Sequence, residues 1–545
     1  MTARVLGGRV RGGSLVPRRA AGSCALASAL LALSALPATS MAAPTPPTVD
    51  PFYVPPPGLA SDPPGSILRW RAVQVMLGPA PLTGAASTGY QLLYRTNDAH
   101  DRPVANATTI IVPTSAPPPG GRQLISVDDA EDSVDPNCAP SYQLQNGEPD
   151  NHNLEAELQL ALPELALGRD LVIPDAEGPQ SEYIVTGMEG HATLDSIRAA
   201  EHFAPAQLGG LATKVGLIGY SGGAHVAAAA NELQPAYAPE LNIVGVAAGG
   251  VPVGNRETID YLDGSIGAGV LMATSIAINR AYPEINLYSF LNAQGKAFAQ
   301  QVSTGCATSV FAAPFHHFSD WTTVPHPFDI PVVARVIALN ALGHATPTAP
   351  TFFYNGIHDE LITIAALDKL VARYCTHGAR IDYYRDPAGF EHIQGVANFF
   401  PLALNYLSDR FNGDPVPDTC GPASSSTTTP SSSNAFRFAR VRHRRDGAVL
   451  LRVYVAGPGV LRATQLIHAA SAGGRRPGRH RPQVLISPSH ATATRAGNVT
   501  LVLRPTATAA KLLRNRPGIS VRVDVTFTPR GGRVTAKVIW VELKR

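Results

Sequence analysis

The passage from Lys214 to His225 is the part of the sequence that most restricts the fold. An apolar run ends at Gly219, the pattern Gly-x-Ser-x-Gly follows at residues 219–223, and small residues then continue from Ala224 to Leu233. Because the pattern alone occurs by chance in glycine-rich chains, the flanking strand and helix carry the argument. Together they predict a sharp strand–turn–helix that exposes the hydroxyl of Ser221 above a helix N-terminus, where developing negative charge is favoured.

Strand and helix patterns alternate around this passage, from about Val73 to Val253. Such alternation is typical of a sheet covered by helices, and with the turn at Ser221 it predicts an α/β class protein with the α/β-hydrolase fold. The helical run Met188–Phe203 leads into the strand before Ser221. The predicted strands are Thr109–Val112, Gln123–Val127, Asp170–Ile173, Lys214–Gly219, Ile243–Ala248, Thr351–Ile357 and Ile381–Arg385.

The alternation stops between about residues 254 and 350. Apolar, helical-looking stretches occur there, such as Ile266–Ile278 and Pro331–Leu342, with His, Pro and aromatic residues between them. An insertion of this size predicts a helical cap over the active site. The alternative is a helical flank with no role in substrate binding.

Residues 1–42 predict a signal peptide. A basic stretch ends at Arg18-Arg19, an apolar run extends from Ala25 to Leu36, and small residues lead to Ser40-Met41-Ala42. The run is too short for an ordinary transmembrane helix, although an uncleaved membrane anchor is the alternative. We therefore expect a secreted protein, either extracellular or associated with the cell envelope.

The charge of the chain is divided between two regions. A Ser/Thr/Pro-rich linker at residues 423–434 separates a predicted hydrolase domain, residues 43–422, from residues 435–545. The net charge of +3 combines −16 for residues 1–433 with +19 for residues 434–545, which hold 22 Lys and Arg against three acids. Alternating apolar and polar residues in this second region predict a small all-β, sandwich-like domain; its predicted strands are Val449–Val455, Val499–Leu503, Ile519–Phe527 and Val534–Val541.

The basic domain is expected to attract polyanions. Exported proteins meet anionic lipids and cell-wall polymers more readily than DNA, so we expect an anionic envelope polymer or lipid as partner and no nucleic acid. A solvated basic surface without a dedicated partner is the alternative. Its densest cluster is Arg475, Arg476, Arg479 and Arg481.

A serine hydroxyl needs a histidine to accept its proton and a carboxylate to orient that histidine. In this fold the acid and then the histidine follow the serine along the chain. Asp359 comes just after one predicted strand and His392 after the next, at the same sheet edge as Ser221. These three residues are the predicted catalytic triad. The competing residues are Glu360, Asp386, His358 and the His316-His317 pair, and His225 is expected to be only a residue of the helix after Ser221.

The oxyanion of the tetrahedral intermediate also needs hydrogen-bond donors. One is expected to be the backbone N–H of Gly222, and the second should come from the loop after the strand Gln123–Val127. Because that loop is acidic, either a backbone N–H or a protonated carboxyl would have to donate. A calcium site without EF-hand spacing is another interpretation; the acids are Asp128, Asp129, Glu131, Asp132 and Asp135.

Four cysteines remain once Cys24 leaves with the signal peptide. An even number in an exported chain predicts two disulfides, and the residues leave three pairings open. Their wide spacing has no CxxC or His-adjacent pattern, so no metal site is expected, and a serine triad needs no metal or organic cofactor. The cysteines are Cys138, Cys306, Cys375 and Cys420.

From about Asp50 to Gly421 the chain resembles the secretory lipase family of fungi and bacteria. The matching passages are Asp-Pro-Phe-Tyr (50–53), Glu-Asp (131–132) before Cys-Ala-Pro-Ser-Tyr (138–142), Glu-Gly (177–178), Gly-Tyr-Ser-Gly-Gly-Ala-His (219–225), Tyr-Ala-Pro-Glu-Leu-Asn-Ile-Val-Gly (237–245), Asp-Glu (359–360) and Glu-His (391–392).

This resemblance implies ester hydrolysis on acylglycerols, with the cap forming the acyl pocket. It carries the triad onto Ser221, Asp359 and His392, and it makes Asp132 the oxyanion partner of Gly222. It also implies the disulfides Cys138–Cys306 and Cys375–Cys420. The cap matches the family poorly, and the family pattern does not cover the basic domain.

The predicted function is therefore that of a secreted triacylglycerol lipase, whose substrate is a lipid or ester at a lipid–water interface. The alternatives are a carboxylesterase for shorter or bulky esters, an acyltransferase in which an alcohol replaces water, a peptidase with the same triad, and a non-catalytic binding protein on a hydrolase scaffold.

Overall fold

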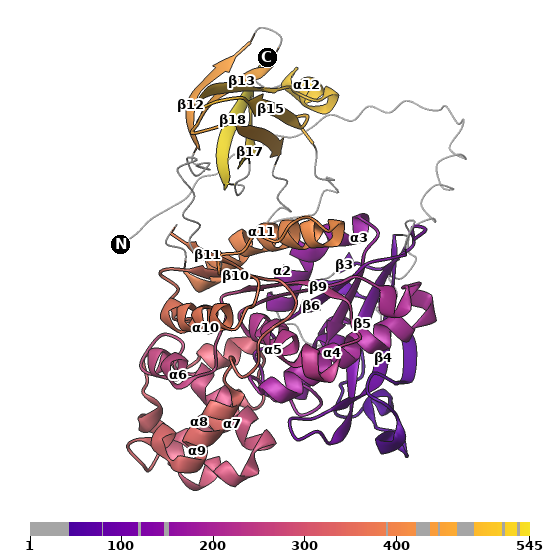
Figure 1. Cartoon of the computed structure of the whole chain (residues 1–545), viewed down its shortest axis with the longest axis vertical. Coiled ribbons are helices and arrows are strands. Elements are labelled where there is room, and N and C mark those ends of the chain that lie inside the picture. Colours follow the sequence, from indigo (N-terminus) through magenta and orange to yellow (C-terminus); the bar gives the residue numbers. More distant parts are fainter. Residues whose placement is uncertain are drawn as a thin grey trace, which may run out of the picture. The chain divides into compact units, whose positions relative to one another are not determined.

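The computed structural model in Figure 1 describes most of the chain after residue 42. The predicted signal peptide, the Ser/Thr/Pro-rich run of the linker and the Arg475–Arg481 cluster lie outside the described residues. The chain divides into two compact units between Gly421 and Pro422, and each is considered by itself. The described ranges are 43–78, 80–84, 86–117, 121–146, 152–387, 391–420, 436–444, 447–465, 484–514, 518–530 and 535–544.

A nine-stranded mixed sheet forms the centre of the first unit, with the strand order β1-β4-β5-β7-β6-β8-β9-β10-β11. The six strands from β7 to β11 in this order run parallel, and β1, β4 and β5 add antiparallel pairs at one side. The strands are β1 Ile67–Val73, β4 Ser87–Asn97, β5 Pro103–Pro113, β6 Leu124–Asp128, β7 Asp170–Pro174, β8 Val215–Tyr220, β9 Ile243–Gly249, β10 Thr351–Gly356 and β11 Ile381–Asp386. This is the predicted α/β-hydrolase fold.

Helices cover both faces of the sheet (Figure 1). Helices α2 (His152–Ala161) and α11 (His392–Asn412) pack with one face in a single apolar cluster. Helices α4 (Thr186–His202), α5 (Gly222–Tyr237) and α10 (Ile364–Thr376) cover the other face. Since both faces are covered, β6, β7, β8 and β10 are buried at every residue rather than at alternate ones.

The segment between β9 and β10 contains no strand of the sheet. It contains α6 (Arg256–Leu262), α7 (Val270–Ala281), α8 (Ala293–Val302) and α9 (Pro331–Asn340), joined by short 3-10 turns. Their buried residues form one apolar cluster that also includes Val134, Tyr183, Leu361 and Ile362 from the hydrolase core. The helical insertion therefore packs directly against the loops at the carboxyl edge of the sheet.

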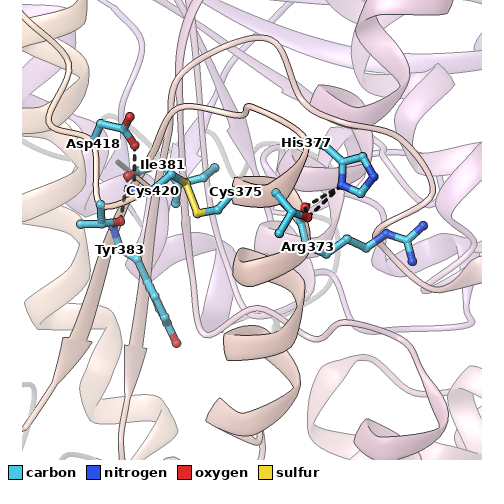
Figure 2. Close-up of a disulfide and its surroundings, with 9 residues drawn as sticks. Arg373, Cys375, His377, Ile381, Tyr383, Asp418 and Cys420 are labelled. Carbon is cyan, nitrogen blue, oxygen red and sulfur yellow. Dashed lines mark hydrogen bonds between the residues drawn. A yellow bond between two sulfur atoms is a disulfide. The ribbon is translucent and has the colours of Figure 1, made fainter. Parts of the chain in front are cut away.

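Two disulfides lie in the first unit, Cys138–Cys306 and Cys375–Cys420, in the pairing that the family resemblance implies. Figure 2 shows the second of these, which joins the end of α10 to the last described residue of the unit. Beside it, Thr419 forms two hydrogen bonds with β11. Its backbone N–H donates to Ile381 O at 2.7 Å, and its hydroxyl accepts the N–H of Tyr383 at 3.2 Å.

The second unit contains two sheets that share one apolar cluster. The three-stranded sheet has the order β12-β13-β16 and the four-stranded sheet the order β15-β14-β17-β18. A short helix, α12 (Ala507–Leu513), is added to the expected all-β arrangement. The strands are β12 Phe436–His443, β13 Val449–Val455, β14 Gly459–Gln465, β15 Ser489–Ala493, β16 Gly497–Leu503, β17 Gly518–Pro529 and β18 Thr535–Lys544.

Candidate active site

Ser221 lies in the tight turn between β8 and α5. Its backbone has φ 54° and ψ −123°, a strained conformation for a residue with a side chain, and its N–H donates to Gly249 O at 2.8 Å. The turn requires glycine on both sides of the serine. A Cβ on Gly219 would lie 2.1 Å from Gly223 O, and one on Gly223 would lie 1.9 Å from Asp128 O. The Gly-x-Ser-x-Gly pattern is therefore explained by close backbone contact.

His392 lies at the start of α11, which covers the face of the sheet opposite to α5, and its side chain contacts Ser221. It is the first residue of α11, rather than a loop residue as expected from the sequence, and it is buried. Its Nε2 lies 2.8 Å from Ser221 Oγ. Tyr220 supports this position because its hydroxyl donates to His392 O at 2.8 Å and its ring, tilted by 43°, has its centroid 5.1 Å from that of the imidazole.

Asp359 completes the chain of hydrogen bonds. Its Oδ2 lies 2.8 Å from His392 Nδ1, and its Oδ1 accepts the N–H groups of Leu361 and Ile362 at 3.0 and 2.8 Å. With both carboxylate oxygens occupied and the side chain buried, the acid has a fixed orientation. In this arrangement Nδ1–H donates to Asp359 and Nε2 can accept the proton of Ser221.

Two further residues, which do not belong to this series of hydrogen bonds, hold the acid and the histidine in place. Glu360 Oε2 accepts the backbone N–H of His392 at 2.8 Å, which satisfies an N–H group at the start of α11. Tyr261, on α6 of the helical insertion, donates to Asp359 O at 2.7 Å. The insertion thus contacts the acid loop directly.

Three of the competing residues, Asp386, His316 and His317, have other partners. Asp386 accepts a hydrogen bond from Tyr354 at 2.7 Å, and His358 is exposed. His317 pairs with Asp263 at 3.1 Å; His316 lies 3.4 Å from Asp320.

His225 lies inside the helix after Ser221, as expected from the sequence. Its Nδ1 is 2.7 Å from Pro252 O and its Nε2 is 3.0 Å from Thr186 Oγ1. Burial lowers the pKa of His225 to about 4, so the ring is neutral near pH 7.

Gly222 and Asp132 face each other beside the serine. A Cβ on Gly222 would lie 2.1 Å from Asp132 Oδ1, so the carboxyl reaches the start of α5. Asp132 has a left-handed backbone with φ 46°, it is buried, and its Oδ1 has no hydrogen-bond partner. Burial raises the pKa of this carboxyl to about 6, although the nearby His392 and a hydrogen bond from Tyr183 act in the opposite direction.

Further buried carboxyl groups surround the acidic loop. Burial raises the pKa of Asp128 and of Asp175 to about 7. In the others, burial together with neighbouring carboxyl groups raises the pKa well above the ordinary value; these are Glu131, Glu157, Glu177 and Glu189. Low dielectric and like charges favour the neutral acid form in such a cluster. No group of three or more His, Cys, Asp or Glu side chains in the described ranges is arranged to hold a metal ion.

Sequence reasoning missed Tyr183, Glu360 in its supporting role, and the distant members of this cluster. Tyr183 and Glu189 lie in a segment without a recognisable catalytic pattern, and Glu157 lies on α2. They come together only through the order of the strands, so no local pattern indicates them.

Comparisons with known proteins identify the family of the chain. The family model described as "Secretory lipase" matches residues 148–419. Lipase A of Arthroderma benhamiae is 34% identical over 394 residues, which cover 69% of this chain and 82% of that protein. The chain belongs to the secretory lipase family.

Two other proteins are similar to this chain. A crystal structure of Candida antarctica lipase A in its closed state matches with a TM-score of 0.63 at 28% identity, over 72% of this chain and 93% of that one. A Mycobacterium tuberculosis protein named as a probable inactive lipase is 34% identical over 382 residues, 68% of this chain and 84% of that protein.

The chain is accordingly a hydrolase with the α/β-hydrolase fold. Its family is one of secreted proteins, which favours an extracellular location. Among the residues that the structure describes, helices that combine the length and apolarity needed to cross a membrane are absent.

Proposed function

We propose that this protein is a secreted triacylglycerol lipase with Ser221 as its nucleophile. The observation that carries the proposal is the continuous chain of hydrogen bonds from Asp359 through His392 to Ser221, with 2.8 Å at each step. A nucleophile, a base and an orienting acid in this order are the groups that acyl transfer requires.

In the first half of the reaction, Ser221 Oγ attacks the ester carbonyl carbon while His392 Nε2 takes the hydroxyl proton. The tetrahedral intermediate collapses when the imidazolium returns that proton to the departing alcohol oxygen, which leaves an acyl-enzyme ester on Ser221. In the second half, water loses its proton to Nε2 and attacks the acyl carbon. The proton then returns to Ser221, and the fatty acid leaves. Asp359 stabilises the imidazolium throughout and keeps its own charge.

The oxyanion is assigned to the space between Gly222 and Asp132. The N–H of Gly222 is one of the groups at the start of α5 without a partner in its own helix. Asp132 supplies the second donor as a neutral carboxylic acid, which its burial and raised pKa support. Each such donor contributes roughly 2.7–4 kcal/mol to transition-state stabilisation.

The helical insertion is proposed to cover the acyl group. A cavity lies within it, lined by apolar side chains that include Leu271, Ile278, Phe290 and Phe318. Its volume of about 40 Å³ holds only a few water molecules, so a long acyl chain requires the surrounding helices to separate. Because the same apolar cluster includes Leu361 and Ile362 beside Asp359, this movement would open next to the triad.

Hydrolysis of p-nitrophenyl esters with two to sixteen acyl carbons, together with titration of fatty acid released from emulsified triolein, tests the proposal. We expect the wild type to cleave long chains and triolein, and Ser221→Ala to lose at least 10⁴-fold in rate, on the order measured in other triads. Ser61→Ala, at an exposed serine, is the matched control and should keep full activity.

Three outcomes would redirect the proposal. Cleavage of short chains alone would leave a carboxylesterase, and ester products formed with an added alcohol would indicate an acyltransferase. Equal activity of wild type and Ser221→Ala would refute the role of Ser221.

The second unit is proposed to keep the secreted enzyme close to an anionic component of its surroundings, an envelope polymer or a lipid. The net charge of +19 over residues 434–545 supports this proposal.

A further inference from the structure

The outer face of the three-stranded sheet in the second unit is rich in arginine. Along β13, Val449, Leu451, Val453 and Val455 are buried against the domain core, and Arg452 between them is exposed. Arg440 of β12 is paired directly with Arg452, and Arg442 with Leu450. Because paired residues share a face of the sheet, Arg440, Arg442 and Arg452 project from one surface, which we call the basic face.

The basic face carries a like-charge pair that does not stabilise the fold. Arg440 and Arg452 are directly opposite each other on neighbouring strands, a placement that costs stability. Neither arginine, nor Arg442, forms a salt bridge with an acid within the described residues, and all three are exposed. Neighbouring strands lie about 5 Å apart, and alternate residues along a strand lie about 7 Å apart, so the Cα atoms of the three arginines lie within a small area of the sheet.

Acidic residues are absent from the strands of this sheet, β12, β13 and β16. The two acids in strands of the unit, Asp524 and Glu542, belong to the four-stranded sheet, where Glu542 pairs with Lys544 at 3.0 Å. The strands of the three-stranded sheet therefore carry four basic residues and no acid, whereas those of the four-stranded sheet carry four basic residues and two acids.

Polar groups complete the basic face. Tyr454 of β13 is half-buried there, and Asn498 and Thr500 of β16 are exposed at the positions paired with Tyr454 and Arg452. A tyrosine ring, an amide and a hydroxyl beside arginine forks match a partner with anionic groups and many hydroxyl groups. Large apolar side chains that could enter a lipid layer are scarce: in the described part of the unit, Val441 and Val484 are the exposed ones.

We infer that the basic face binds an anionic polysaccharide, with guanidinium groups on its carboxylate or sulfate groups and the polar side chains against its sugar rings. The inference rests on the proposed role of the second unit as an anchor and names the surface and the partner class. It does not depend on the hydrolase chemistry of the first unit.

The test compares two triple variants of the full chain with the same change in charge. The first is Arg440→Gln/Arg442→Gln/Arg452→Gln. The control is Arg462→Gln/Arg514→Gln/Arg530→Gln, which removes three exposed arginines outside the three-stranded sheet. Binding of each protein to heparin, to vesicles of anionic and zwitterionic phospholipid and to duplex DNA is measured at several salt concentrations.

We expect wild type and control to bind heparin at 0.15 M NaCl more tightly than vesicles or DNA. The basic-face variant should lose at least tenfold in affinity. The slope of its log K against log salt concentration should decrease in magnitude by about two to three. Its Tm should not decrease, because a like-charge pair is removed.

Equal losses in the two variants would overturn the inference and assign binding to net charge alone. Tighter binding to vesicles or to DNA than to heparin would overturn it in favour of that partner, and no binding by the wild type at 0.15 M NaCl would also overturn it. Hydrolysis of p-nitrophenyl butyrate is measured in parallel. If no protein cleaves the ester, the lipase proposal fails, while the binding result still decides this inference.

Discussion

Asp132 offers the sharpest test of how the oxyanion is stabilised. Two donors are possible at this position, the backbone N–H or a neutral carboxyl group. Replacing the side chain separates them, because Asp132→Asn keeps the shape and a permanent donor while Asp132→Ala removes the side-chain donor. If the carboxyl donates, Asp132→Ala should lower kcat by about 10²–10³, which corresponds to roughly 2.7–4 kcal/mol.

The pH dependence follows from the environment of the carboxyl. Its pKa of about 6, raised chiefly by burial from 3.8, favours the neutral form by about 3 kcal/mol relative to an ordinary aspartate. In the free enzyme about 90% of Asp132 is neutral at pH 5 and about 1% at pH 8. The donor is therefore present at low pH and is lost as the pH rises through 6.

The assay is kcat/KM for p-nitrophenyl butyrate between pH 5 and 8, because this parameter reports the ionisation of the free enzyme. Dividing wild type by Asp132→Asn isolates the effect of the ionisable carboxyl, including the effect of its charge on the nearby His392. We expect the ratio to fall by about tenfold per pH unit above pH 6. A constant ratio, with Asp132→Ala within threefold of wild type, would refute the carboxyl as donor and leave the backbone N–H.

Two other features lead to measurable expectations. Glu360→Ala should lower kcat about tenfold with KM unchanged, because loss of the hydrogen bond to His392 N–H shifts the start of α11. Glu360→Gln keeps an acceptor and should keep most of the activity. Equal activity of the two variants would contradict this role. Asp128 and Asp175 hold protons in the folded protein and release them on unfolding, so their contribution to stability is complete below about pH 4 and is lost as the pH rises through 7. Tm by calorimetry should decrease from pH 5 to 8, and Asp128→Asn should flatten the decrease; a Tm that rises over this range would contradict the reasoning.

The fold and the reacting groups were predictable because their evidence is local. The turn at Ser221 requires small residues within five positions, and Asp359 and His392 each follow a strand whose apolar run is visible in the sequence. Strand order then brings the three together at one edge. The roles assigned to these residues stay predictions until the variants are measured.

Other features depend on long-range packing and were missed. Strands β1 and β4 were not predicted, since β1 reads Ile-Leu-Arg-Trp-Arg-Ala-Val and mixes charges with apolar residues at a sheet edge. In the second unit β12, β14 and β15 were also missed; in β12 a bulge between Phe438 and Arg440 interrupts the alternation of apolar and polar residues. An acidic loop beside an oxyanion was unexpected from the sequence, because Tyr183, Glu157 and Glu189 become neighbours of this loop only through the fold.

The Cys375–Cys420 disulfide determines how a pull on the second unit would reach the enzyme. Any tension along residues 421–435 arrives at Cys420, the last described residue of the first unit. From there the covalent bond passes it into α10, and the hydrogen bonds of Thr419 to β11 carry the remaining load. An enzyme held to a polymer by its second unit could therefore be dragged by flow without peeling β11, the strand before His392, from the edge of the sheet.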